Sequence, residues 1–120
     1  PSWIDHEADR ALARRWLAET ADLDLEAAVR WIYASRPDWD AERIARRTRE
    51  VMRGPARLAD DVAGWLAPCL GGGPDDPFLD VGCGNGTLLA AAAAAGRPGI
   101  GIDVSMAWLV VAARMIAEHG

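Results

Sequence analysis

Seven consecutive residues, from Asp80 to Gly86, combine an acid with three alternating glycines in the order Asp-Val-Gly-Cys-Gly-Asn-Gly. Glycines let the backbone turn tightly and approach a ligand closely. A helix that starts there adds free N–H groups and a positive dipole end. The neighbouring acid would repel a pyrophosphate and attract an ammonium group. The segment therefore predicts a site for a nucleotide-like cofactor that carries a positive charge.

The spacing of the glycines separates two classes of cofactor. The dinucleotide fingerprint G-x-G-x-x-G requires a glycine at the position that Thr87 occupies here. Glycine recurs instead at Gly82, Gly84 and Gly86. This pattern argues against a nicotinamide-dependent oxidoreductase.

A second acid, Asp103, follows another short apolar run of the chain. In nucleotide-binding βαβ units, a carboxylate about 20 residues after the glycine loop grips the ribose diol. Each of its two oxygens can accept one hydroxyl hydrogen bond. Asp103 is therefore a candidate for ribose binding.

Strand, acid, alternating glycines, helix, strand and terminal acid together resemble motif I and its surroundings in class I (Rossmann-like) S-adenosylmethionine-dependent methyltransferases. The resemblance covers about residues 77–120. It implies S-adenosyl-L-methionine as cofactor, with its methionine portion in the glycine loop, its ribose on Asp103, and its adenine near Val104 and Met106. The cofactor-binding residues it implies are Asp80, Gly82, Cys83, Gly84, Gly86, Asp103, Val104 and Met106.

The elements that must position these residues can be predicted from hydrophobic patterning. Residues 78–81 and 100–104 are short apolar runs typical of buried parallel strands. The alanine-rich residues 87–95 form a helix between them, and Ser105 caps a last helix over residues 106–119. The second half is therefore a βαβα unit with adjacent parallel strands and a right-handed crossover.

The first half of the chain predicts only helices. They cover residues 5–19, a segment after Asp24 that ends near Ser35 and Arg36, a segment from Asp38 or Asp40 to Arg53, and a segment from Pro55 to about Leu66. Aspartate is a favoured N-cap, and Pro37 disfavours helix in the residue before it. Gly54 followed by Pro55 predicts a stop and a restart. We expect Trp16, Trp31 or Trp65 to pack against one another or the sheet.

The predicted fold class is α/β, an N-terminal helical region followed by the first βαβα of a truncated Rossmann-like methyltransferase sheet. Residues 1–70 would form a helical cap, and residues 71–120 the start of the S-adenosylmethionine-binding domain. The resemblance implies seven strands in a complete domain. Two parallel strands alone leave edges unpaired. The sequence therefore predicts part of a longer enzyme, inactive by itself.

Composition narrows the range of partners. The net charge is −5, and 51% of the residues are hydrophobic, as in a globular protein. The acidic balance argues against nucleic acid and favours a small-molecule methyl acceptor. No apolar run reaches the length of a membrane span, and two cysteines are too few for a zinc site or disulfide framework. All basic residues are arginines, a bias typical of bacterial GC-rich coding sequences. Because the sequence shows neither a membrane span nor a basic-then-apolar leader, a cytoplasmic enzyme is expected.

Several of these residues also have a purely structural interpretation. Asp80 could cap the following helix or hold the loop, and Cys83 fits a small loop residue better than a nucleophile. His6 and His119 lie near the termini, where solvent exposure is expected. The arginine-rich stretch 43–57 predicts either a solvated face paired with nearby acids or a docking surface for an anionic substrate or partner.

Two classes of function are consistent with the sequence. One is a methyltransferase, the other a non-catalytic module with the methyltransferase fold. Methyl transfer needs mainly in-line positioning. An acceptor hydroxyl also needs a general base. The sequence singles out no such base, so no catalytic residue is assigned.

Overall fold

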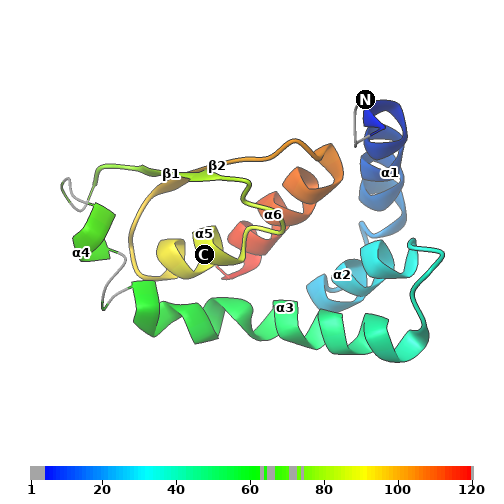
Figure 1. Ribbon diagram of the computed structural model, residues 1–120, viewed down its shortest axis with the longest axis horizontal. Helices are drawn as coiled ribbons and strands as arrows, with labels where there is room; N and C mark the ends of the chain where they lie inside the picture. The colour runs from blue at the N-terminus through cyan, green and yellow to red at the C-terminus, as the bar shows by residue number, and fades with distance from the viewer. Residues whose placement is uncertain (1–4, 63, 65–66, 71–72, 74, 120) are drawn as a thin grey trace.

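The computed structural model describes residues 5–62, 64, 67–70, 73 and 75–119 of the 120-residue chain. The elements are α1 (His6–Glu19), α2 (Leu25–Ala34), α3 (Ala41–Asp61), α4 (Ala67–Leu70), β1 (Phe78–Val81), α5 (Thr87–Ala94), β2 (Gly99–Ile102) and α6 (Met106–His119). Figure 1 shows α5 and α6 between the two-stranded sheet and the long helix α3. None of the helices in the described part combines the length and the hydropathy needed to cross a membrane.

Aspartates begin the first three helices. Asp5 accepts two backbone N–H bonds of 3.0 Å at the start of α1. Asp24 and Asp40 each accept the N–H three residues further on, at 2.7 Å, and so begin α2 and α3. Such caps stabilise a helix by about 1 kcal/mol. The prediction for Asp24 is confirmed, Asp40 rather than Asp38 caps the third helix, and α2 ends before Pro37 as predicted.

Helix α3 runs without a break from Ala41 to Asp61, so the predicted stop at Gly54 and separate helix from Pro55 are wrong. Gly54 lies where α3 crosses α5, and a Cβ there would be 2.3 Å from the Cγ2 of Thr87. The glycine therefore permits a close helix crossing. Pro55 is buried inside α3 and cannot donate a backbone hydrogen bond, which costs about 3 kcal/mol. The packing of α3 against α2 and α5 must offset this cost.

The two strands are adjacent and parallel, which confirms the predicted pairing. Phe78 lies opposite Gly99, and Val81 lies opposite Ile102. The face with Gly101 packs on α5, where a Cβ at Gly101 would be 2.4 Å from Leu89. The chain therefore contains a small parallel sheet within a mainly helical structure. The opposite face exposes Leu79, Val81, Ile100 and Ile102.

The core consists of two apolar clusters. The larger lies among α1, α2 and α6 around Trp16, which is 1% exposed and donates its indole N–H to the carbonyl of Ala28 at 2.9 Å. Trp31 packs against the same cluster, so these two tryptophans share one core, whereas Trp65 lies outside the described residues. The smaller cluster, which includes Phe78, lies under the sheet. The larger cluster joins helices from both halves of the chain, so the N-terminal helices pack directly on the helix that follows β2.

Candidate functional site

The glycine loop connects β1 to α5, and its three glycines have different surroundings. Gly82, Gly84 and Gly86 have φ values of 79°, 54° and 75°, a region that side chains disfavour. A Cβ at Gly86 would lie 2.8 Å from the Cβ of Ala112, so this glycine allows the loop to pack on α6. A Cβ at Gly82 or Gly84 would meet no atom within 4 Å. These two glycines border open space, where a ligand has access to the backbone.

Asp103 joins this loop to the end of β2. One carboxylate oxygen accepts the N–H of Gly84 at 2.9 Å, and the other accepts the N–H of Ser105 at 2.8 Å. The carbonyl of Ile102 accepts the N–H of Gly82 at 2.8 Å. Because a carboxylate oxygen can accept more than one hydrogen bond, Asp103 keeps acceptor capacity for a ligand. The backbone N–H groups of Gly84 and Ser105 together fix the position of the Asp103 carboxylate.

Two other titratable groups of this region, Asp80 and Cys83, both have raised pKa values. Burial raises the pKa of the Asp80 carboxyl, and the charge of Asp103 raises it further. No hydrogen bond from a described residue reaches that carboxyl. Burial also raises the pKa of the Cys83 thiol, as do Asp103 and Asp80. The thiol is 8% exposed and faces Gly101. Cys83 therefore has the environment of a packing residue.

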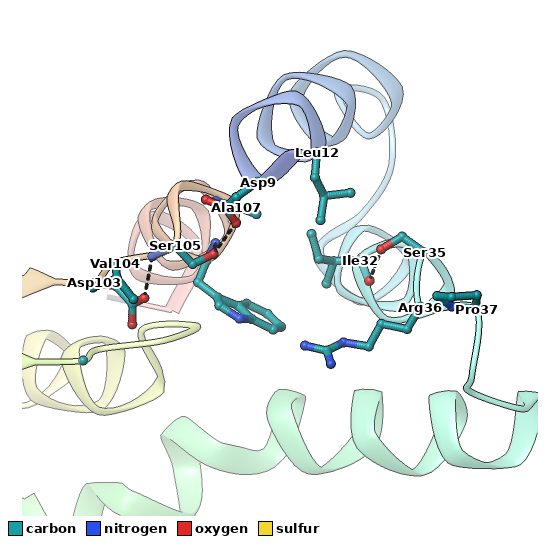
Figure 2. A pocket seen from close by; sticks show the side chains of 12 residues that line it. Asp9, Leu12, Ile32, Ser35, Arg36, Pro37, Asp103, Val104, Ser105 and Ala107 are labelled. Atoms are coloured by element: carbon teal, nitrogen blue, oxygen red, sulfur yellow. Dashed lines mark hydrogen bonds between the residues drawn. The ribbon is translucent and has the colours of Figure 1, made fainter. Parts of the chain in front are cut away.

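A cavity of about 600 Å³ lies beside the loop, between the strand ends and the first two helices (Figure 2). Its lining consists of Asp9, Leu12, Ile32, Ser35, Arg36, Pro37, Gly82, Asp103, Val104, Ser105, Ala107 and Trp108. The volume is within the range of about 300–1,000 Å³ typical of small-ligand sites. Parallel sheets bind ligands beyond the carboxyl ends of their strands, which is where this cavity lies.

The cavity contains some of the predicted site residues. Gly82, Asp103 and Val104 line it. Gly84 is connected to it through its bond to Asp103. The other predicted residues, Asp80, Cys83, Gly86 and Met106, are not part of the lining.

Asp9 of α1 is a site residue that the sequence did not indicate. Its carboxylate accepts the hydroxyl of Ser105 at 2.6 Å and the N–H of Met106 at 2.5 Å. Ser105 in turn accepts the N–H of Trp108 at 3.2 Å, which confirms it as a cap of α6. Asp9 is thus a second cap for α6, supplied by a distant helix. It fixes α1 against the segment that carries Asp103.

Arg36 is a second residue of the cavity that the sequence did not single out. Figure 2 shows its side chain extending from the end of α2 into the space opposite Asp103. Among the described residues, no group of three or more His, Cys, Asp or Glu side chains could hold a metal ion. The cavity lining contains the carboxylates of Asp103 and Asp9 and the guanidinium of Arg36, which can bind a ligand through hydrogen bonds and charge.

Comparison with known proteins relates this chain to a methyltransferase. Over 94 residues, or 78% of the chain, it is 37% identical to the ubiquinone biosynthesis O-methyltransferase of Alkalilimnicola ehrlichii. The match covers 32% of that protein, so the chain spans about a third of the length of this curated relative. No protein-family model matches the chain, and no solved structure matches it. The match supports a methyltransferase-family relationship.

Proposed function

We propose that this chain is the cofactor-binding part of a class I methyltransferase that uses S-adenosyl-L-methionine to methylate a small molecule. The observation that carries the proposal is the connection between the glycine loop and Asp103. The loop follows one parallel strand, Asp103 follows the next, and a 2.9 Å hydrogen bond joins Gly84 to Asp103 at the edge of a cavity of suitable size. The relative's name, an O-methyltransferase, adds support.

The described residues fit the proposed cofactor in volume and in chemistry. The backbone at Gly82 and Gly84 borders open space for the methionine portion. Asp103 retains acceptor capacity for two ribose hydroxyls. Val104 is 56% exposed at the cavity wall and offers an apolar surface to the adenine, with Met106 beyond it. Asp80, without a hydrogen-bond donor among the described residues, suits a cationic ligand group nearby.

The sulfonium of the bound cofactor supplies an electrophilic methyl group attached to a good leaving group. The residues of this chain bind and orient it. Helices α1 and α2 contribute much of the cavity wall, and we assign residues 1–70 the role of a cap that limits water around the reacting atoms. The acceptor must then approach in line with the sulfur–methyl bond, and its positioning accounts for much of the rate.

Substitution of Asp103 tests the proposal. In the full-length protein, Asp103→Ala should weaken S-adenosylhomocysteine binding by tenfold or more, because charge-assisted hydrogen bonds contribute about 1.5–3 kcal/mol. Asp103→Asn preserves the shape and exchanges one acceptor for a donor, so it should also weaken binding. Asp22→Asn, an exposed acid in the turn before α2, is the matched control. Unchanged affinity by calorimetry in both Asp103 variants would refute the assigned role.

A further inference from the structure

A second cavity, of about 450 Å³, adjoins the first and shares a wall with it. Arg36 and Trp108 line both cavities. The second cavity also has a lining of Arg43, Arg46, Arg47, Glu50, Tyr33 and Trp39. A ligand lying across the shared wall would therefore contact both the glycine-loop cavity and this arginine cavity.

The arginine cavity carries an excess of positive charge. Glu50 is the acid in its lining, and it pairs with Arg47 at 2.9 Å. Among the described residues, no carboxylate lies within ion-pair distance of Arg36, Arg43 or Arg46. The whole chain has a net charge of −5, so this concentration of cations differs from the rest of the molecule. A cleft lined by one sign of charge attracts ions of the opposite sign.

An aromatic ring contacts two of these cations, Arg36 and Arg43. Tyr33 and Trp39 stack with a centroid distance of 5.2 Å and an interplanar angle of 4°. The guanidinium of Arg43 lies 4.2 Å from the centre of the Trp39 ring, and that of Arg36 lies 5.0 Å from it. Such cation–π contacts orient a guanidinium without neutralising it. The guanidinium groups of Arg36 and Arg43 therefore lie against the Trp39 ring and keep the charge and the N–H donors needed to bind an anion.

The same aromatic frame connects the arginine cavity to the glycine loop. Tyr33 is 3% exposed, and burial raises the pKa of its hydroxyl. Arg47, which lines the arginine cavity, and Asn85, in the glycine loop, both act to lower that pKa, so both side chains lie near the Tyr33 hydroxyl. Asn85 also accepts the hydroxyl of Thr87, at 2.6 Å. The cations are thus positioned relative to the proposed cofactor site through packed side chains.

We propose that the arginine cavity binds an anionic group of the methyl acceptor, a carboxylate or a phosphate. The proposal rests on the proposed function, and it specifies the substrate class as a negatively charged small molecule. Guanidinium forks bind carboxylate and phosphate oxygens through paired N–H donors. With the anion on Arg43 and Arg46, the rest of the acceptor would extend past Arg36 and Trp108 toward the glycine-loop cavity.

Small aromatic anions test this proposal in the full-length protein saturated with S-adenosylhomocysteine. Benzoate and phenyl phosphate are titrated by calorimetry, with benzamide as the uncharged probe. We expect at least one anion to bind more tightly than benzamide, and the preferred anion identifies the acceptor's group. The double variant Arg43→Gln/Arg46→Gln should weaken that binding at least tenfold. Arg49→Gln, on the same helix but outside the cavity lining, should leave it unchanged.

Glu50→Gln provides a test of opposite sign. It removes the acid that pairs with Arg47, so anion binding should become tighter. The proposal is overturned if neither anion binds better than benzamide, or if the double variant binds the preferred anion as the parent does. S-adenosylhomocysteine affinity, measured separately, should be unchanged in the double variant. If the parent protein does not bind S-adenosylhomocysteine, the proposed function is contradicted instead. Titration of the anions in the absence of cofactor would still test the arginine cavity.

Discussion

The two adjoining cavities of this molecule differ in the charges that surround them. The glycine-loop cavity has two carboxylates in its lining, Asp103 at the end of β2 and Asp9 of α1, with Asp80 nearby. The arginine cavity has guanidinium groups from α3 that no nearby acid fully balances. Within a single chain, one cavity suits a cationic cofactor and the other an anionic partner. If the two proposals hold, this separation of charge would orient the cofactor and the methyl acceptor toward each other.

The largest expected effects come from valine substitutions in the glycine loop, where Gly84→Val should affect cofactor binding and Gly86→Val should affect stability. Gly84→Val places a branched side chain at positive φ next to open space, so it should abolish S-adenosylhomocysteine binding while the fold persists. Gly86→Val would overlap Ala112 of α6, so it should destabilise the fold, by about 1–3 kcal/mol from overpacking plus 1–2 kcal/mol from the positive φ. Circular dichroism and calorimetry separate the outcomes. Normal binding by folded Gly84→Val would remove the loop from the site.

A smaller effect is expected at Asp9, the carboxylate that α1 contributes to the glycine-loop cavity. Asp9→Ala should lower the free energy of unfolding by about 1–2 kcal/mol, because α6 loses a cap. It should also weaken S-adenosylhomocysteine binding, since Ser105 and the adjacent Asp103 lose an anchor. Asp5→Ala, which removes an ordinary cap of α1, is the control. We expect it to cost similar stability and leave affinity unchanged, and equal loss of affinity in both variants would contradict a specific role for Asp9.

The smallest effect is a pH dependence from Asp80. Its pKa is raised in the folded protein, so its ionisation opposes folding, and the stability present below its ordinary pKa is lost as pH rises through the raised value. Asp80→Asn should therefore stabilise the unliganded protein at neutral pH, as measured by chemical denaturation.

The same carboxyl should affect cofactor binding in the opposite sense. A cationic cofactor favours the ionised Asp80, so affinity for S-adenosylmethionine should increase as pH rises through the raised pKa. Calorimetry over a pH series should show this increase in the parent protein and its loss in Asp80→Asn. An identical pH profile in both proteins would show that Asp80 does not sense the cofactor.

Features fixed by local sequence could be predicted. Aspartate caps depend on residues three positions apart, and the strands follow from short apolar runs next to glycines. The pairing of β1 with β2 and the positions of α5 and α6 were predictable for this reason. The candidate loop was likewise visible in the residue pattern from Asp80 to Gly86.

Features that depend on distant contacts could not be predicted. Gly54 and Pro55 carry a local stop signal, but α3 continues through them, and Gly54 lies where α3 packs closely on Thr87 of α5. Asp9 looks like an ordinary first-turn acid of α1, because the residues it caps lie more than 90 positions away. The close packing of Gly86 against Ala112 of α6 also could not be predicted from the sequence.

The most direct test of the central claim is a pair of titrations of the full-length parent protein, one with S-adenosylhomocysteine and one with NAD. On the proposed function, the alternating glycines, the acid before them and Asp103 would bind the nucleoside and the amino acid of the first ligand. The neighbouring Asp80 opposes the pyrophosphate of the second. We predict saturable binding of S-adenosylhomocysteine, one molecule per chain, and no measurable binding of NAD. Binding of NAD with equal or greater affinity, or no binding of S-adenosylhomocysteine, would contradict the account.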